Sequence, residues 1–308
     1  MSAVLTGSSR AVASVVDLIG NTPLIRLTSF EGGLRNVELY AKAEWRNPGG
    51  SVKDRPAARM IADGEASGAL TYDKIILDAT SGNTGIAYAM IGAAKGYRVR
   101  LCVPENVTPE RKRILLGFGA DIVFTDPMEG SDGAIIRAKA MYAANPDRYF
   151  YPDQYNNPGN WRAHFDTTAA EILEQTGGRL THVIAGVGTG GTVTGLGRRL
   201  KEHDPKIRLI CVIPDAFPGI EGLKPLGHPE DIVPAILDER VIDERVPVSS
   251  DDAYAMCGRL ARAGFFVGQS SGAYMAGVER VARRERRGRF VTLFNDLGER
   301  YFSVRLWD

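Results

Sequence analysis

The sequence predicts an α/β fold with mainly parallel sheet and helices on both faces. Short apolar runs of strand length alternate with helical stretches along nearly the whole chain of 308 residues, and such alternation is typical of βαβ units. Two of the runs end in glycine-rich turns that open helices. The length suits one large or two medium domains.

Eight runs are predicted as strands. In order, they are residues 37–44 (VELYAKAE), 74–80 (KIILDAT), 97–103 (YRVRLCV), 121–126 (DIVFTD), 148–153 (RYFYPD), 181–188 (THVIAGVG), 207–214 (IRLICVIP) and 289–296 (RFVTLFND). Helices are expected to open near Ser51, to run from about residue 83 to 95, and to begin near Pro109. Residues 217–234 form the longest irregular stretch, and long loops of this kind are often functional.

Composition excludes several classes of protein. Apolar residues make up 44% and charged residues 24%, and the formal net charge is +1, so nucleic acid and anionic membrane are not expected partners. No stretch approaches the roughly 20 apolar residues of a membrane helix, and we expect a cytoplasmic protein. Cys102, Cys211 and Cys257 have no metal-site spacing, so no metal is expected. Cys102 and Cys211 lie in predicted strands and are interpreted as buried structural thiols.

The first candidate site is residues 47–55 (NPGGSVKDR). Two glycines lead into Ser51, a natural helix N-cap, and Asp54 stands three residues later, which completes a capping-box pattern. Lys53 would then lie in the first helical turn. The helix dipole presents positive charge there and should lower the pKa of the amine, which makes it a better nucleophile. The alternative is a surface lysine with its amine in water.

The second candidate is the 80–85 turn (TSGNTG), directly after a predicted strand and at the start of a helix. Thr80, Ser81 and Thr84 offer hydroxyls, and Asn83 can both donate and accept hydrogen bonds. The helix N-terminus favours an anion. A merely tight turn does not need four polar side chains in six residues.

The third candidate is the 186–192 loop (GVGTGGT), which also follows a strand and opens a helix. Its composition is that of a phosphate cradle. It also holds the pattern G-x-G-x-x-G at Gly186, Gly188 and Gly191, and Asp215 ends the next strand, so a dinucleotide site is a real alternative. The combination of sites separates these interpretations. An aldehyde cofactor that carries a phosphate and acts on an amino acid needs an amine, a phosphate cradle and a carboxylate pocket together.

Six segments in order along the chain resemble the β-family of pyridoxal 5′-phosphate enzymes, specifically cysteine synthase (O-acetylserine sulfhydrylase). They are residues 21–27 (NTPLIRL), 42–57 (KAEWRNPGGSVKDRPA), 80–87 (TSGNTGIA), 188–192 (GTGGT), 268–273 (GQSSGA) and 296–303 (DLGERYFS). The resemblance runs from about residue 17 to the last residues. Residues 104–134 are more similar to the B-type isozyme than to the A-type. The resemblance implies the fold of the tryptophan synthase β-like enzymes, with two doubly wound domains.

The resemblance also implies a role for each matched position. Lys53 matches the lysine that binds the cofactor as an aldimine and later transfers the α-proton. The positions that match the rest of the cofactor site are Asn83, at the cofactor's 3′-oxygen, Gly188, Thr189, Gly190, Gly191 and Thr192, at its phosphate, and Ser270, at its pyridine nitrogen. The positions that match the substrate-carboxylate site are Thr80, Ser81, Asn83, Thr84 and Gln154.

The activity that the resemblance implies is β-replacement. O-acetylserine, or O-phosphoserine, would lose its β-substituent to give an aminoacrylate, to which a sulfur nucleophile adds to form L-cysteine. A neutral serine opposite the pyridine nitrogen suits this elimination. Residues 296–298 read Asp-Leu-Gly, where the family usually has Asp-Ser-Gly or a similar run. We expect this departure to alter a secondary hydrogen bond near the pyridine end.

The resemblance further implies a homodimer. A smaller domain of residues 46–157 would close over the substrate, and a larger one, residues 1–45 plus 158–308, would hold the phosphate. Closure would keep water from the reacting centre. The sequence names neither the sulfur donor nor a protein partner such as a sulfur-carrier protein or serine acetyltransferase.

Four alternatives remain open. Cystathionine β-synthase would use homocysteine as the acceptor. An enzyme that uses O-phosphoserine would need a cation near the leaving group, for which Lys224 is a candidate, although an exposed loop lysine is the simpler interpretation. Outside this class stand a non-catalytic pyridoxal-phosphate-binding protein and an NAD-dependent oxidoreductase.

Overall fold

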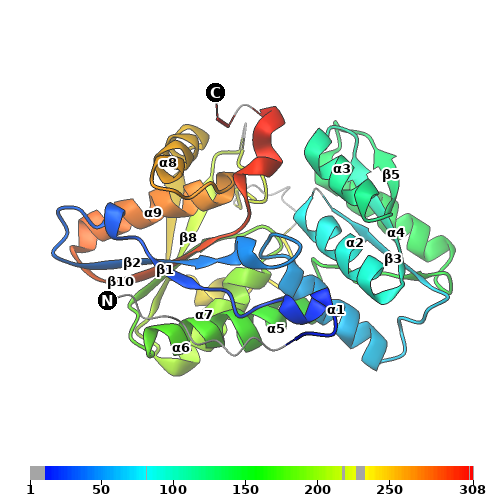
Figure 1. The fold of residues 1–308 in the computed structure, drawn as a ribbon, viewed down its shortest axis with the longest axis horizontal. Helices are drawn as coiled ribbons and strands as arrows, with labels where there is room; N and C mark the ends of the chain where they lie inside the picture. Colours follow the sequence, from blue (N-terminus) through cyan, green and yellow to red (C-terminus); the bar gives the residue numbers. More distant parts are fainter. Residues whose placement is uncertain (1–10, 81, 217–218, 227–232, 305, 308) are drawn as a thin grey trace.

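The structure is a computed structural model that describes residues 11–80, 82–216, 219–226, 233–304 and 306–307. Two sheets lie side by side, each flanked by helices, as Figure 1 shows. The larger sheet has the order β1-β2-β10-β7-β8-β9, and the smaller has the order β5-β4-β3-β6. All neighbouring strands are parallel except β1 and β2. The predicted α/β fold with mainly parallel sheets is confirmed.

Eight strands overlap the predicted runs, with ends that differ by a few residues, and two further strands are present. Those of the larger sheet are β1 (Leu24–Arg26), β2 (Asn36–Ala43), β7 (His182–Gly186), β8 (Arg208–Pro214), β9 (Glu244–Val248) and β10 (Arg287–Phe294). Those of the smaller sheet are β3 (Ile75–Ala79), β4 (Arg98–Pro104), β5 (Asp121–Thr125) and β6 (Tyr149–Phe150). Sequence reasoning missed β1 and β9, both at edges of the larger sheet. One is only three residues long, and the other contains a proline.

The helices cover both faces of each sheet. The α-helices are α1 (Asp54–Ala66), α2 (Asn83–Lys95), α3 (Pro109–Gly117), α4 (Gly130–Ala144), α5 (Pro158–Ala163), α6 (Ala169–Thr176), α7 (Gly191–His203), α8 (Ser250–Arg262) and α9 (Gln269–Glu285). Short 3-10 helices are η1 (Val15–Leu18), η2 (Thr28–Phe30), η3 (Glu44–Arg46), η5 (Glu239–Val241) and η6 (Gly298–Val304), and a π-helical turn, η4 (His164–Thr168), joins α5 to α6. In Figure 1, α8 and α9 lie on one face of the larger sheet, and α6 and α7 on the other.

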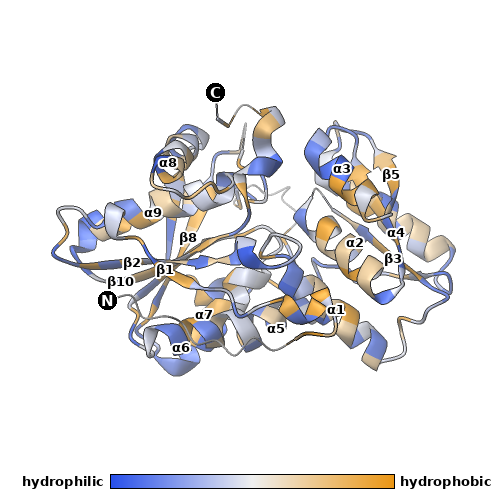
Figure 2. Ribbon diagram, viewed as in Figure 1, coloured by the Kyte–Doolittle hydropathy of each residue, from blue (hydrophilic) through white to orange (hydrophobic). Residues whose placement is uncertain are grey.

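Each sheet has a hydrophobic core of its own. One cluster of buried side chains packs around the larger sheet and includes Ile184, Ile210 and Phe290. Two separate clusters flank the smaller sheet, one under α1 and α2 and the other under α4. In Figure 2 the interior strand β8 is hydrophobic, whereas much of the peripheral helix α6 is hydrophilic. Cys102 and Cys211 are fully buried within β4 and β8, as predicted.

The smaller sheet lies within the predicted smaller domain, residues 46–157, since its strands span residues 75–150. The boundaries of both domains, and the closure of one over the other, stay predictions. The strand orders define a switch point in each sheet, between β3 and β6 and between β7 and β10. In open parallel sheets, ligands bind beyond the carboxyl ends of the strands at such points. The segments that follow these four strands are therefore where a site is expected.

Candidate active site

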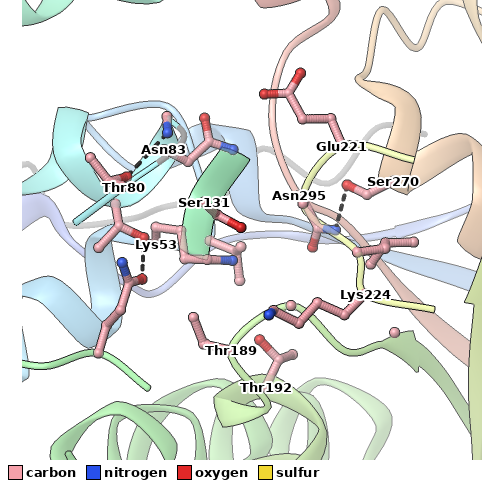
Figure 3. A pocket seen from close by; sticks show the side chains of 18 of the residues that line it. Lys53, Thr80, Asn83, Ser131, Thr189, Thr192, Glu221, Lys224, Ser270 and Asn295 are labelled. Atoms are coloured by element: carbon pink, nitrogen blue, oxygen red, sulfur yellow. Dashed lines mark hydrogen bonds between the residues drawn. The ribbon is translucent and has the colours of Figure 1, made fainter. Parts of the chain in front are cut away.

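A pocket of about 150 Å³ lies where the segments after both switch points meet. Figure 3 shows Lys53, Thr80, Asn83, Thr189, Thr192 and Ser270 around it. Of the residues predicted for the site, those that line the pocket are Lys53, Thr80, Asn83, Thr84, Gln154, Gly188, Thr189, Gly190, Thr192, Lys224 and Ser270. Ser81 lies outside the described residues. Gly191 is absent from the lining because it packs against Asn160 behind the loop.

Lys53 immediately precedes α1 and is held there by the larger sheet. The main-chain N–H of Val52 donates to the carbonyl oxygen of Asn295 at 2.9 Å, and Ser51 forms an isolated bridge with Asp296. Burial lowers the pKa of the Lys53 amine, and the negative charge of Asp296 opposes that shift. The direction of the predicted shift agrees, but burial and not the helix dipole is its main cause.

The predicted capping box is wrong. Lys53, not Ser51, stands at the N-cap of α1, and the Ser51 hydroxyl accepts a hydrogen bond from the N–H of Lys53, at 3.2 Å, instead of from the third helical residue. The Asp54 carboxylate accepts from the N–H of Gly49 at 2.5 Å instead of reaching back to Ser51. Gly50, in the turn that precedes the helix, adopts a φ of +78°.

The 80–85 turn is tied to the segment after β6. The Thr80 hydroxyl oxygen accepts from the N–H groups of Gly82 and Gly85, both at 3.1 Å. The Thr84 hydroxyl donates to Oε1 of Gln154 at 2.8 Å, and Nε2 of Gln154 donates to the carbonyl oxygen of Ala79 at 2.7 Å. Because β3 and β6 are parallel neighbours, their carboxyl ends bring Gln154 beside a turn about 70 residues earlier. Helix α2 begins at Asn83, as predicted.

Asn83 is held from two sides. Its Nδ2 donates to Oδ2 of Asp296 at 2.7 Å, and Arg300 donates to its Oδ1. The Tyr301 hydroxyl donates to the same Oδ2 of Asp296 at 2.7 Å. Arginine is only a donor, so Arg300 fixes which end of the Asn83 amide is oxygen. The Asp296 carboxylate thus supports Asn83. Leu297, the residue that departs from the family pattern, forms an isolated bridge with Val267 just before α9, and its effect on a hydrogen bond near the pyridine end stays a prediction.

The 186–192 loop forms a cradle that only glycine permits. A Cβ at Gly188 would lie 2.5 Å from the carbonyl oxygen of Gly222, and Gly190 has a φ of +87°. Helix α7 is 13 residues long, begins at Gly191 and directs its N-terminus at the pocket. A helix N-terminus in this position favours the binding of a phosphate. Thr189 and Thr192 add hydroxyls. These residues fit the phosphate end of pyridoxal phosphate.

Asp215, the acidic residue that would have supported a dinucleotide site, forms a different contact. Oδ2 of Asp215 accepts from the N–H of Ser250 at 3.0 Å, at the start of α8, and Asp215 is not among the residues that line the pocket. The acidic residue needed for a ribose hydroxyl is therefore turned away from the loop. Within the described ranges, no group of three or more His, Cys, Asp or Glu side chains could hold a metal ion.

Ser270 opens α9 on the far side of the pocket. Its Oγ accepts a hydrogen bond from Nδ2 of Asn295 at 2.9 Å (Figure 3), and Asn295 is fixed in turn because its N–H donates to Oγ of Ser271 at 2.8 Å. With its oxygen occupied by that donor, the Ser270 hydroxyl can direct its own hydrogen into the pocket.

Sequence reasoning missed several residues that line the pocket, among them Arg111, Ser131, Glu221, Asn295 and Tyr301. Arg111 of α3 forms an ion pair with Glu221, and its side chain is only 3% exposed. Lys224 also lines the pocket, with Nζ 3.7 Å from Oδ1 of Asp132 and 5.5 Å from the ring centre of Tyr155. The position of Asn295, directly after β10, could have indicated it as a site residue. Arg111 stands in a charged run of the sequence, and such a run predicts an exposed helix and gives no sign of a site.

Comparisons with known proteins agree with this geometry. Residues 15–296 match the model of the family described as "Pyridoxal-phosphate dependent enzyme". The chain belongs to this family. It is thus a pyridoxal-phosphate enzyme, and the predicted cofactor is confirmed.

No helix among the described residues is long and apolar enough to cross a membrane.

Relatives within the family carry the name that the resemblance suggested. The chain is 48% identical over 307 residues to a cysteine synthase of Aquifex aeolicus, and the aligned region covers 97% of this chain and 93% of the Aquifex protein. It is 38% identical over 294 residues to cysteine synthase B of Escherichia coli, with 95% of each chain covered. The crystal structure of a cysteine synthase from Entamoeba histolytica superposes with a TM-score of 0.92 at 32% identity, and covers 100% of this chain and 94% of that one.

Proposed function

We propose that this chain is a cysteine synthase, which replaces the β-substituent of O-acetylserine by sulfide to form L-cysteine. The observation that carries the proposal is that the Lys53 amine shares one pocket with the 80–85 turn and the glycine cradle of the 186–192 loop. The relatives named cysteine synthase support the choice of reaction.

Pyridoxal phosphate, when bound, supplies an electron-withdrawing ring that stabilises negative charge at the substrate's α-carbon. Lys53 supplies the base. Because burial lowers the pKa of its amine, more of the amine is neutral near pH 7, and Nζ can accept the α-proton. Acetate leaves as the bond between Cβ and oxygen breaks. Sulfide then forms the bond to Cβ, and Nζ returns the proton to the α-carbon.

The substrate carboxylate belongs at the 80–85 turn. Helix α2 begins at Asn83 and directs its N-terminus there, and a carboxylate is the charge that such an end favours. Thr84 is directed by its hydrogen bond to Gln154, and Thr80 by the two N–H groups that it accepts. We place the substrate's carboxylate beside Thr80, Ser81, Asn83, Thr84 and Gln154.

The pyridine nitrogen belongs at Ser270 and the ring's 3′-oxygen at Asn83. One N–H of the Asn83 amide is committed to Asp296, and the second is left to donate. Ser270 is neutral and directs its hydrogen into the pocket, so it bonds the ring nitrogen without forcing a full positive charge on it. A weaker electron sink suits expulsion of a β-leaving group.

The first test is the visible spectrum of the purified protein with O-acetylserine and then with sulfide. We expect a band of the lysine-bound cofactor, a new band on addition of O-acetylserine, and return of the first with L-cysteine as product. In Lys53→Ala the cofactor should no longer be attached covalently, which mass spectrometry after borohydride reduction would show. The rate of cysteine formation should fall at least about 100-fold. Lys95→Ala, which removes a lysine that pairs with Glu65, is the matched control.

The same assay separates the rival donors and acceptors. A spectrum that ignores O-acetylserine but responds to O-phosphoserine would move the donor assignment to the phosphorylated substrate. Product formation with homocysteine but not with sulfide would make the chain a cystathionine β-synthase. A cofactor band with no response to any of these amino acids would leave a non-catalytic binding protein.

We also infer a cytoplasmic homodimer whose smaller domain, residues 46–157, closes over the substrate. The resemblance supports the dimer. The ion pair between Arg111 of the predicted smaller domain and Glu221 of the larger supports closure. Light scattering of the eluting protein tests the dimer, and cell fractionation tests the compartment. Small-angle scattering with and without a bound amino acid tests closure.

A further inference from the structure

The helical segment behind the 186–192 loop carries two polar side chains that have no role in the reaction proposed above. Asn160 of α5 and His164 of η4 stand four residues apart, so they share one face of the segment. Both are only 1% exposed. Figure 1 shows α5 beside α7, and α7 also contacts η4. The π-helical turn at residues 164–168 is itself a rare geometry that recurs at functional sites.

Glycines on α7 bring this segment unusually close. A Cβ at Gly191 would lie 2.0 Å from Oδ1 of Asn160, and a Cβ at Gly195 would lie 2.7 Å from Cβ of His164. These two glycines are also four residues apart. The spacing of the two glycines on α7 therefore matches the spacing of Asn160 and His164 on the opposite segment. The close approach at both glycines places Asn160 and His164 directly under the loop.

Asn160 joins the two halves of the pocket. Its Nδ2 donates to the carbonyl oxygen of Gln154 at 2.7 Å and to Oγ1 of Thr189 at 3.0 Å. Because a carbonyl can only accept, Gln154 fixes the amide with Nδ2 toward Thr189. The Oδ1 of Asn160 is buried and has no hydrogen-bond partner among the described residues. The Thr189 oxygen is thus an acceptor toward Asn160, which leaves its hydroxyl hydrogen for another partner.

His164 has the corresponding relationship to Thr192. Its Nε2 lies 3.3 Å from Oγ1 of Thr192, and its Nδ1 lies 3.0 Å from Oγ1 of Thr168. Burial lowers the pKa of the imidazole to about 3, so the ring is neutral and carries a single N–H. If Thr168 donates to Nδ1, that N–H is on Nε2 and points at Thr192. The Thr192 hydroxyl hydrogen is then also left for another partner.

We propose that Asn160 and His164 are positioning residues for the cofactor's phosphate. By donating to Thr189 and Thr192 from behind, they direct the hydroxyl hydrogens of both threonines toward the anion in the cradle. Asn160 further ties this loop to Gln154, at the substrate end of the pocket. The inference rests on the proposed placement of the phosphate in the 186–192 loop.

The test compares pyridoxal phosphate with pyridoxal, which lacks the phosphate, by titrating each into the apoprotein. The readout is the ratio of the two dissociation constants. Asn160→Leu and His164→Leu remove the donors without adding charge, and each should lower the preference for the phosphorylated form about tenfold or more. His164→Gln, which keeps a donor near the position of Nε2, should recover most of it. The ³¹P resonance of the bound cofactor should shift in both leucine variants.

Matched substitutions at exposed positions are the controls. Asn156→Leu and His203→Leu change the same residue types on the surface, and the ratio should stay at the wild-type value. Equal weakening of both ligands in Asn160→Leu and His164→Leu would mean that the segment only supports the fold, and the proposal would be wrong. A wild-type protein without preference for the phosphorylated form would instead refute the placement of the phosphate. A hydrogen on Nδ1 of His164, read from ¹⁵N shifts, would refute the part played by His164.

Discussion

Nδ2 of Asn83 donates a 2.7 Å hydrogen bond to Oδ2 of Asp296, a residue 213 positions further along the chain. Asp296 is fully buried, and the same oxygen accepts from Tyr301. The bond connects the turn after β3 with the segment after β10, one from each sheet. The carboxylate also raises the pKa of Lys53 against the effect of burial. Asp296 therefore influences both the proposed 3′-oxygen contact and the proposed base.

Replacement of Asp296 by alanine should affect both partners. The Nδ2 of Asn83 and the Tyr301 hydroxyl would lose their acceptor, which costs about 1–3 kcal/mol of unfolding free energy. The pKa of the Lys53 amine should fall further, since a nearby negative charge is lost. Chemical denaturation of the apoprotein measures the first effect, and the pH dependence of reductive methylation at Lys53 measures the second. An unchanged Lys53 profile would contradict the electrostatic role.

Gly188→Ala should abolish tight cofactor binding. The added Cβ would lie 2.5 Å from a main-chain oxygen, that of Gly222, which has no flexible side chain to move aside. We expect at least a tenfold weaker affinity for pyridoxal phosphate, measured by titration of the apoprotein. Gly117→Ala is the control, because a Cβ there meets nothing within 4 Å. Normal binding by Gly188→Ala would show that the cradle tolerates a side chain.

Lys224→Ala should change the preference between donors. Lys224 lines the same pocket as the 80–85 turn, and a doubly charged leaving group would interact with its amine more strongly than a neutral acetyl ester. We expect kcat/KM for O-phosphoserine to fall by about tenfold relative to that for O-acetylserine, since an interaction with a charged group is worth about 1.5–3 kcal/mol. Lys201→Ala, in which a surface ion pair with Asp243 is lost, should leave the ratio unchanged. An unaltered ratio in Lys224→Ala would return this residue to the role of a loop lysine.

Asp78 should make stability depend on pH. Burial raises the pKa of its carboxyl from 3.8 to about 7 in the folded chain. The folded state therefore binds more protons than the unfolded state between about pH 4 and pH 7. Its contribution to stability is complete below pH 4 and is lost as the pH rises through 7, because ionisation is penalised only in the fold.

Asp78→Asn should remove this dependence. The amide resembles the protonated acid, and it can keep the contacts with the N–H of Ala79 and with the Tyr88 hydroxyl. Urea unfolding at pH 5 and pH 8 measures the effect. Relative to the wild type, the variant should gain about 2–3 kcal/mol more at pH 8 than at pH 5. An equal difference at both pH values would mean that Asp78 is ionised in the fold at pH 5 as well.

Much of the fold could be predicted from local pattern. Each of the eight predicted runs overlaps a strand, because a strongly apolar run of strand length between helical stretches has few alternatives to a buried parallel strand. The start of α2 at Asn83 follows from the glycine and hydroxyl pattern before it. The edge strands β1 and β9 were missed, since an edge strand is short or only half-buried and leaves a weak pattern.

The amino-acid sequence by itself determined the chemistry of the pocket. Lys53, the 80–85 turn and the 186–192 loop are contiguous motifs, and their residue types already imply an amine, a carboxylate site and a phosphate cradle. The tertiary structure alone decided which distant side chains support them. Arg111, Asn160, His164 and Asp296 reach the pocket, or the loops around it, through strand order and helix packing. Those contacts depend on which strand ends are neighbours in each sheet, a relationship that no local spacing encodes.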